Sequence, residues 1–544
     1  MESSQGKQTA SEEHQGHQAE NLSGQGTATT SGGSGMHLNV STRSHNEMER
    51  GLTNRHVQFI AIGGTIGTGL FLGSGESIAL TGPSIVLVYI AVGLVMYLMM
   101  RAIGELMYAD PDQHTFINFI NRYCGPAVGK FALGSYWVAL LLVGMTELSA
   151  VGAYFVSFFG TFGIDLSSWK WVIELVFLVA LIGLNTCAVK MFGETEFWFS
   201  MIKITLIIAM IVTAVVMLII GFHYGQTSIP GQDHPSPGAA VSLANVFNGF
   251  SLAPNGWAKF LMSFQMVFFA YTLIEFVGVT VSETKDPRHV IPKAINNIIM
   301  RVLIFYVGAL LAIMTIVPWR NFQPNEDGSY TSPFIMVFEY AGLDWAAALV
   351  FFVVLTASSS ALNSLLYSAG RHLYQIAGNS ASSHVKGLHQ VSHQKVPARA
   401  IAVSGALVGI CVIVSMFPQI SGSFVLFSSA ASAVIIFIYI LTMIAHYCYR
   451  RSSDFMPNGF LMPAYKFLDP LGILFFVFIY VTLFIGNSTR GPAIVSFIWF
   501  VVFGVFCLIR YPMKRPHNKN ADLITTESSS DKEPLAKTDS EESA

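Results

Sequence analysis

The chain has 544 residues, of which 52% are hydrophobic and only 11% are charged. A soluble globular protein carries roughly 25% Asp, Glu, Lys and Arg, so this composition excludes a soluble enzyme, a collagen and a disulfide scaffold. Thirty basic and 32 acidic residues give a formal charge of −2, and no basic bias predicts a nucleic-acid partner. The composition indicates an integral membrane protein with many spans, surrounded by the lipid bilayer.

The two ends of the chain differ in composition from the middle. Residues 1–47 are rich in Ser, Gly, Gln, Thr and His, and residues 516–544 are Ser-rich and acidic. Neither stretch can bury enough apolar surface to offset its ordering entropy, so we expect two disordered tails around a transmembrane domain at 48–515. No charged and then apolar leader precedes the first apolar run, and we therefore expect no cleavable signal peptide.

Twelve apolar runs follow one another between these tails. They lie near residues 56–76, 83–108, 127–160, 168–187, 197–220, 258–282, 297–317, 336–378, 398–416, 423–447, 469–486 and 491–511. Most have the roughly 20 residues that a helix needs to cross a bilayer, and backbone groups without water must form helices. The sequence therefore predicts an all-α protein with 12 transmembrane helices.

The loops between these runs alternate in charge. Most Lys and Arg residues lie in every second loop, and the intervening loops hold only Lys170, Lys259, Arg320 and Arg490. Because cytoplasmic loops are enriched in basic residues, we expect both termini to be cytoplasmic. An even number of spans is required for that topology, which agrees with twelve.

Glycine is concentrated in the middle of the first span. Gly63, Gly64, Gly67 and Gly69 fall within seven residues, and each weakens a helix by roughly 1 kcal/mol relative to Ala. A small-residue packing seam is one interpretation. The other is a broken helix, which is favoured by a second weak stretch near residues 268–275, because interrupted spans at matching places in two halves are typical of inverted-repeat transporters.

A few ionisable residues lie inside the apolar runs, where each is energetically costly. Lys203 lies about two turns into the fifth span, where it either snorkels to the interface or occupies a cation position and changes protonation during transport. Glu147 in the third span is either a pocket wall or a buried partner for a basic residue. Glu275 in the sixth span is either functional or a polar clamp on a neighbouring helix.

Two further groups are candidates for a pocket or a gate. Arg101 and Glu105 are four residues apart near the end of the second span, which predicts an intrahelical or gating ion pair. Ser358 and Ser359 belong to a polar cluster in the eighth span that either coordinates a cation or holds helices together. No P-loop or metal-ligand spacing is present, and we expect no cofactor, no metal site and no enzyme activity.

From about residue 51 to residue 511 the chain resembles the amino acid permeases of the amino acid–polyamine–organocation superfamily. The resemblance rests on the Gly-rich first span and on collinear motifs. These are GLTNRH at 51–56, GEL at 104–106, GETEFW at 193–198, SETKDP at 282–287, IPKAI at 291–295 and SPF at 332–334. The segments VKMFGE at 189–194 and PW at 318–319 look most like the D-alanine/D-serine/glycine permease subgroup, whereas LVGMTEL at 142–148 is closer to aromatic amino acid permeases.

The resemblance implies a LeuT-like core with a 5+5 inverted repeat, over about 56–220 and 258–447, plus two extra helices at about 469–511. It also implies a substrate site between the two broken helices. The substrate carboxylate would meet Thr65, Gly67, Thr68 and Gly69, the α-ammonium would meet carbonyls of Phe269, Ala270 and Thr272, and Phe269 or Tyr271 would form an aromatic lid. Lys203 matches a lysine that takes the place of sodium in similar proton-coupled members. At Leu273 the family commonly has Gly, and we expect the bulkier residue to reshape the side-chain pocket.

We therefore expect a secondary active amino acid transporter in the cell membrane, driven by the proton gradient. The expected substrate is a small neutral amino acid such as alanine, serine or glycine, with D-forms included. The alternatives are a permease for aromatic or other neutral amino acids, and an amino acid antiporter. A membrane-embedded enzyme or a channel is a different class for which the sequence offers no convergent catalytic groups and no repeated filter motif. The sequence does not fix an oligomeric state.

Overall fold

A computed structural model describes residues 66–511, except positions 112, 114, 187–188, 224–239, 248–249, 277–286, 325–329, 379–382, 395 and 418–421. The predicted tails at 1–47 and 516–544 lie outside these residues, as does most of the first predicted span. Within the described residues the regular structure is entirely helical, because isolated bridges such as Pro324 with Tyr330 are the only β-type pairings.

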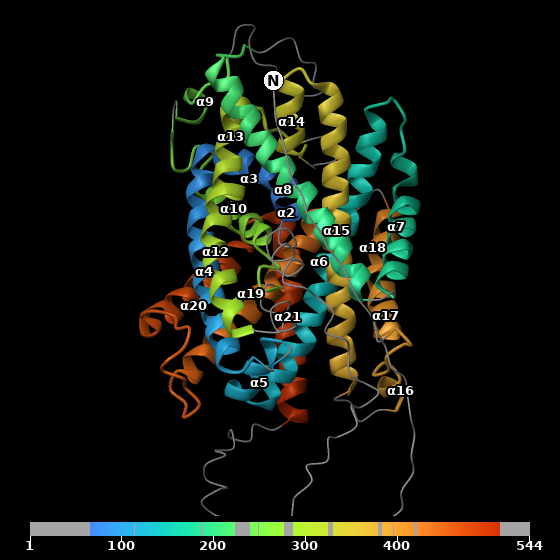
Figure 1. The fold of residues 1–544 in the computed structure, drawn as a ribbon, viewed down its shortest axis with the longest axis vertical. Helices are drawn as coiled ribbons and strands as arrows, with labels where there is room; N and C mark the ends of the chain where they lie inside the picture. Colours follow the sequence, from blue (N-terminus) through green and yellow to red (C-terminus); the bar gives the residue numbers. More distant parts are fainter. Residues whose placement is uncertain are drawn as a thin grey trace, which may run out of the picture. The chain divides into compact units, whose positions relative to one another are not determined.

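The helices follow the apolar runs in chain order (Figure 1). In the first half they are α2 (Thr68–Phe71), α3 (Gly73–Thr81), η1 (Gly82–Ser84), α4 (Ile85–Ala109), α5 (Ile117–Cys124), α6 (Pro126–Gly160), η2 (Ser167–Trp169), α7 (Lys170–Asn185) and α8 (Val189–Ile219). In the second half they are α9 (Ala244–Phe247), α10 (Trp257–Ala270), α12 (Pro287–Arg301), η3 (Val302–Gly308), α13 (Ala309–Ile316), η4 (Trp319–Asn321), α14 (Pro333–Tyr340), α15 (Asp344–Gly378), α16 (Ser383–Lys386), α17 (Ala398–Val408), α18 (Ile410–Ser415), α19 (Ser423–Tyr449), α20 (Tyr465–Thr482) and α21 (Asn487–Arg510).

Ten helices of the described chain are long and apolar enough to cross a membrane. They correspond to ten of the twelve predicted runs. The two remaining runs are the first and the sixth, in which the sequence predicts broken helices. The sixth run begins with the shorter apolar helix α10, which ends at Ala270.

The eighth run, predicted as one long segment over 336–378, is divided in the structure. It contains α14 and α15, which are separated by the turn at 341–343. Gly342 in this turn has a φ of +69°, a left-handed conformation that Gly adopts without the steric penalty of a side chain. The sequence analysis placed this division inside one apolar run, although Glu339, Gly342 and Asp344 interrupt the apolar residues there.

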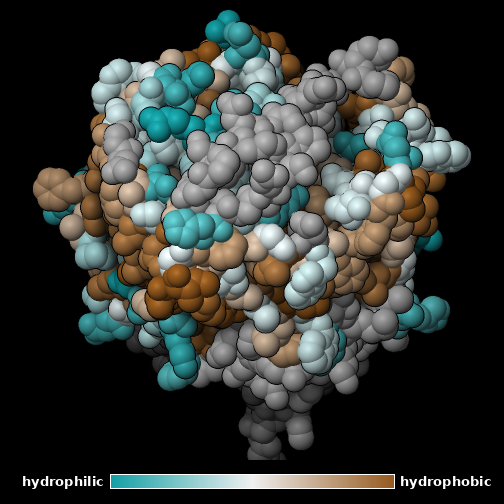
Figure 2. Space-filling model, turned by 90° about the horizontal axis from the view of Figure 1, so that it is seen from above, coloured by the Kyte–Doolittle hydropathy of each residue, from teal (hydrophilic) through white to brown (hydrophobic). Residues whose placement is uncertain are grey.

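The helices differ in how much of their surface is covered by protein. The long helices α6 and α15 pack against each other and are mostly buried, whereas α7, α20 and α21 expose most of their surface (Figure 1). The exposed side chains of these outer helices are largely apolar, as at Val176, Leu474 and Val502. Seen from one end, hydrophobic residues appear along the flanks among hydrophilic ones (Figure 2). An apolar exterior around a buried centre is what a lipid environment requires.

Candidate functional site

The described chain begins at Ile66, two residues before its first helix α2, and we call this place the first break because the sequence predicts one here. Ile66 and Gly67 are not helical, and Gly67 precedes α2 with an extended backbone conformation. The first backbone donor of the helix is the N–H of Leu70, which donates to the Gly67 carbonyl over 3.2 Å. The N–H groups at the beginning of a helix have no partner within it, so those of Thr68 and Gly69 are in the position predicted for binding a carboxylate. Thr65, the fourth predicted residue of this set, lies outside the described residues.

The second break lies directly against the first. Helix α10 ends at Ala270, and residues 271–275 form turns. A Cβ atom added to Gly69 would lie 2.5 Å from the Ala270 Cα atom, which is far closer than any side chain tolerates. Gly69 thus allows the backbones of the two broken helices to touch, and the break and the small-residue seam occur together in one place.

The carbonyl groups at the end of α10 already accept hydrogen bonds. The Tyr306 hydroxyl donates to the Ala270 carbonyl over 3.0 Å, and the Thr272 hydroxyl donates to the Phe269 carbonyl over 2.6 Å. A carbonyl oxygen has two lone pairs and can accept a second bond. The Phe269 carbonyl already accepts two bonds, because the backbone N–H of Thr272 also donates to it over 3.1 Å. The Ala270 carbonyl accepts one bond from Tyr306 and keeps capacity for the predicted contact with an ammonium.

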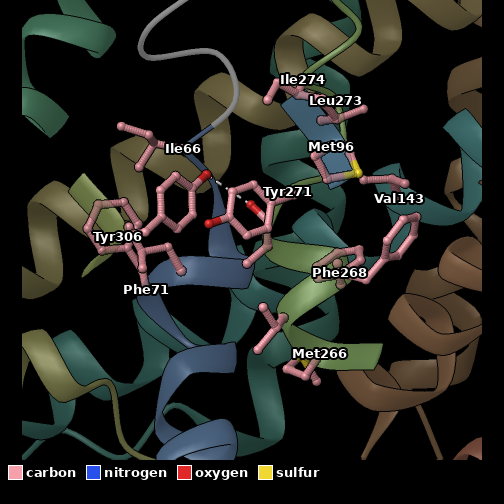
Figure 3. Close-up of a cluster of buried hydrophobic side chains, with 14 of the residues drawn as sticks. Ile66, Phe71, Met96, Val143, Met266, Phe268, Tyr271, Leu273, Ile274 and Tyr306 are labelled. Atoms are coloured by element: carbon pink, nitrogen blue, oxygen red, sulfur yellow. Dashed lines mark hydrogen bonds between the residues drawn. The ribbon is translucent and has the colours of Figure 1, made fainter. Parts of the chain in front are cut away.

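The two predicted lid aromatics differ in how firmly they are held. The Tyr271 hydroxyl donates to the Tyr89 carbonyl over 2.9 Å, and its ring stacks on Tyr306 with centroids 4.6 Å apart. Figure 3 shows Tyr271 and Tyr306 in the cluster beside Ile66 and Phe71. Phe269 has an edge-to-face contact with Phe424 at 6.0 Å and no hydroxyl to anchor it. Of the pair, Phe269 is the side chain with fewer constraints on its movement.

Leu273, which the sequence singled out only for its bulk, has an unusual backbone conformation. Its φ is +70°, one of two positive values among the described residues other than Gly, and its side chain is buried. A positive φ is strained for a residue with a Cβ atom. The Gly common in the family at this place would adopt it freely, so this chain holds a strained residue at the second break.

Glu147 reaches the first break from α6. Its Oε1 atom accepts a hydrogen bond of 2.9 Å from the Thr68 hydroxyl, and a Cβ atom at Gly67 would lie 2.9 Å from the same oxygen. Glu147 thus lies beside the predicted carboxylate position, and it also interacts electrostatically with Lys203, so both interpretations of Glu147 stay open. The Thr68 hydroxyl, predicted to assist the substrate carboxylate, is bonded to Glu147 instead.

Lys203 is completely buried and does not snorkel to an interface. Its Nζ atom donates to the Ile66 carbonyl over 3.3 Å and to the Ser360 hydroxyl over 3.1 Å. The Ser360 hydroxyl in turn donates to Oε2 of Glu196 over 2.9 Å, and Asn363 donates to Oε1 over 3.2 Å. We call Glu196, Lys203, Ser360 and Asn363 the Lys203 network, and it joins α8 and α15 to the first break.

The serine cluster of α15 contributes to this network through a residue that the sequence did not select. The hydroxyls of Ser358 and Ser359 donate to carbonyls of their own helix, those of Val354 and Leu355. Ser360, one position further, faces Lys203 and Glu196. The rotation of the helix decides which of three consecutive serines points at a neighbour, and periodicity does not fix that rotation.

Glu275, in the turn that follows α10, is held by two tyrosines. The hydroxyl of Tyr136 donates to Oε1 over 2.8 Å, and the hydroxyl of Tyr439 donates to Oε2 over 2.5 Å. Both donors come from other helices, α6 and α19. This geometry is that of a polar clamp between helices, which was one of the two interpretations of Glu275.

The predicted ion pair between Arg101 and Glu105 is wrong. Glu105 Oε1 lies 2.5 Å from Arg450 Nε, and Glu105 Oε2 lies 3.2 Å from His446 Nε2. Arg101 instead donates to the Leu461 carbonyl and packs on the Phe460 ring. The four-residue spacing made the local pair available, but Glu105 faces α19 across the bundle and meets its partners there.

Glu105 belongs to a larger group of buried charges. His446 Nδ1 lies 2.8 Å from Asp469 Oδ2, so the ring stands between two carboxylates. The backbone N–H of Met462 also donates to Glu105 over 2.6 Å. We call Glu105, His446, Arg450 and Asp469 the Glu105 network, and it fastens α20 to α4 and α19.

Glu196 was missed as a site residue although a signal was present. It lies in the GETEFW motif and precedes Lys203 by seven residues, which places the two side chains on one face of a helix two turns apart. The sequence thus offered a carboxylate next to the one buried lysine. Its connection through Ser360 could not be predicted, since that residue comes from a helix more than 150 positions away.

Comparisons with known proteins show which family this chain is similar to. A family model for amino acid permeases matches residues 56–520. The DL-alanine permease SerP2 of Lactococcus lactis subsp. cremoris is 45% identical over 462 residues, which cover 85% of this chain and 95% of the relative. The serine permease SerP1 of the same organism is 41% identical, with 85% and 98% covered. The D-serine/D-alanine/glycine transporter of Escherichia coli (strain K12) is 36% identical, with 84% and 93% covered.

Proposed function

Because the chain belongs to the amino acid permease family, we propose that it carries a small neutral amino acid across the cell membrane together with protons, by alternating access. The transport of amino acids follows from the family itself. The substrate, the coupling ion and the direction of transport are the content of the proposal.

The observation that carries the proposal is the position of Lys203. Its buried ammonium is within hydrogen-bond distance of the Ile66 carbonyl, directly before helix α2 and at the predicted break. Unwound carbonyls of this kind coordinate the coupling cation in transporters with broken helices. An ammonium in that place supports coupling through a proton taken up and released by Lys203, without a cofactor and without sodium.

The proposed substrate position lies between the two breaks. The carboxylate would accept from the N–H groups at Gly67, Thr68 and Gly69, and the α-ammonium would donate to the carbonyls of Ala270 and Thr272. The substrate class is supported by the names of the relatives, which specify alanine, serine and glycine.

The proposal includes the architecture that such a carrier requires. Ten helices account for ten of the spans, and we propose that the first and sixth runs complete twelve spans. Five spans would form each half of a LeuT-like inverted repeat, α20 and α21 would be the two extra helices, and both termini would face the cytoplasm. Such a protein moves its substrate without covalent chemistry and is a carrier, not an enzyme.

Transport by purified protein in proteoliposomes tests this proposal. We expect labelled L-alanine to show counterflow, which distinguishes a carrier from a channel, and to accumulate when a proton gradient is imposed in sodium-free buffer. Alanine, serine and glycine, with their D-forms where they exist, should compete best within a panel of the twenty amino acids plus D-alanine and D-serine.

Four results would contradict the proposal. Absence of counterflow would indicate a channel, competition by aromatic amino acids alone would indicate the other substrate class, and a strict requirement for sodium would exclude an ammonium in the cation position. Accumulation that needs a counter-substrate inside the vesicles, with no effect of the proton gradient, would indicate an antiporter.

A further inference from the structure

Glu196 is the carboxylate that the structure connects to Lys203. Both side chains are fully buried on α8, and they are seven residues apart. A buried charge is tolerated only when it is paired or hydrogen-bonded, and each of these two residues therefore requires a compensating partner. Glu196 and Lys203 have opposite charges, so each can serve as the partner of the other.

The connection between them has a single consistent direction of donation. The Lys203 ammonium can only donate, and it donates to Ser360, whose hydroxyl then donates to Glu196. The two hydrogen bonds measure 3.1 Å and 2.9 Å, so Nζ and Oε2 are at most about 6 Å apart. An opposite charge at that distance favours the ionised form of a side chain.

The other oxygen of Glu196 is also occupied by a donor. Asn363 donates to Oε1 over 3.2 Å, and Asn185 of α7 donates to the side-chain oxygen of Asn363 over 2.7 Å. The bond from Asn185 therefore orients the amide group of Asn363 toward Glu196. Hydrogen bonds to both oxygens favour the anionic form of a carboxyl group and fix its orientation.

The remaining groups around Lys203 do not replace Glu196. The carboxylates that act electrostatically on Lys203 are Glu196 and Glu147, and Glu147 is bonded to Thr68 at the first break. The neighbouring helix α15 contributes hydroxyl and amide groups, α7 contributes Asn185, and α13 carries no titratable side chain. The Tyr306 hydroxyl of η3 donates to the Ala270 carbonyl.

We propose that Glu196 is a positioning residue which, through Ser360, stabilises the protonated form of Lys203 and thereby sets the pH range in which transport is coupled to protons. In the proposed cycle an aqueous proton binds the Lys203 amine on one side of the membrane and leaves to water on the other. Glu196 keeps its charge throughout and exchanges no proton. The inference rests on the proposed function, since it concerns the proton-coupling step of the same site.

The test compares Glu196→Gln with the wild type in sodium-free proteoliposomes, over a range of external pH. Gln retains the shape of the side chain but removes the negative charge. We expect counterflow within about twofold of the wild type, and a proton-driven accumulation whose half-maximal pH lies about one unit lower, because more protons are needed to charge Lys203. Glu196→Asp keeps the negative charge, so its half-maximal pH should lie close to that of the wild type.

Glu174→Gln is the matched control. Glu174 is a buried carboxylate 3.8 Å from Lys170 on α7, so its substitution removes a comparable charge away from the Lys203 network. This control should keep the wild-type pH profile. A shift as large as that of Glu196→Gln would overturn the inference, because it would show a general effect of buried carboxylates.

Ser360→Ala provides a second variant that does not depend on the folding of Glu196→Gln. It removes the bridging hydroxyl and leaves both charges, and we expect the pH profile to move in the same direction. An unchanged profile in folded Glu196→Gln overturns the inference, and so does an unchanged profile in Ser360→Ala where Glu196→Gln does not fold. If the wild type shows counterflow but no proton-driven accumulation, the proposed proton coupling is wrong, and the inference is wrong with it. If the wild type is coupled to protons but the variant has the same pH profile, only the inference is wrong.

Discussion

The Glu105 network and the Lys203 network both bury charges among apolar helices, but they pair those charges differently. In the Glu105 network a carboxylate lies 2.5 Å from a guanidinium and 3.2 Å from an imidazole. In the Lys203 network a serine hydroxyl stands between the ammonium and the carboxylate. Direct pairs stabilise one arrangement, whereas a bridged pair leaves the ammonium able to change its protonation. The comparison suggests that one network is structural and the other functional.

The Lys203→Ala substitution should separate the two networks most clearly. It removes the proposed proton carrier, so we expect proton-driven accumulation to fall to the level of protein-free liposomes. The thermal unfolding midpoint should change by only a few degrees, because Glu196 loses its opposite charge but keeps the hydrogen bonds from Ser360 and Asn363. Unchanged accumulation with an unchanged pH dependence would show that Lys203 has no part in coupling.

The Glu105→Ala substitution should have the opposite pattern. It leaves Arg450 without its carboxylate and His446 with Asp469 alone, and breaking a buried pair costs about 3–5 kcal/mol of the free energy of unfolding. Thermal unfolding in detergent measures this loss, while counterflow by the folded fraction should persist.

Asp110→Ala is the control for that experiment. Asp110 pairs with Arg122 over 3.0 Å with both side chains partly exposed, and exposed pairs contribute about 0.2–1 kcal/mol. If Glu105→Ala proved no more destabilising than this control, the structural role of the Glu105 network would be refuted.

Gly67→Ala tests whether the close contact between Gly67 and Glu147 matters for substrate binding. The added methyl group would lie 2.9 Å from Glu147 Oε1 and should displace the carboxylate and its bond to Thr68. We expect the KM for the substrate to rise about tenfold, equivalent to about 1.4 kcal/mol. Gly491→Ala on α21, where the methyl group meets no atom within 4 Å, should keep the wild-type KM.

The smallest effect concerns the strained Leu273. Leu273→Ala and Leu273→Gly both delete the buried side chain, but only Ala retains a Cβ atom at a φ of +70°. We therefore expect the Gly variant to be more stable than the Ala variant by about 1 kcal/mol, which reverses the usual order in a helix. Equal unfolding midpoints for the two variants would show that the positive φ is not maintained in the membrane.

Local patterns predicted the features that depend on a single helix. The density of glycines and the family motifs located the breaks near Gly67 and Ala270, and the depth of Lys203 in an apolar run identified the buried cation. Features that depend on contacts between distant helices were not predictable. The four-residue spacing of Arg101 and Glu105 suggested the wrong ion pair, because no local sequence pattern predicts Arg450 or His446 as partners of Glu105.

The most direct test of the account follows protons instead of substrate. Sodium-free proteoliposomes containing a pH-sensitive dye are given external alanine, and the internal pH is recorded for the wild type and for Lys203→Ala. We predict acidification of the interior by the wild type and none by the variant, although the variant is folded. No acidification by the wild type, or equal acidification by both proteins, would contradict proton coupling through Lys203.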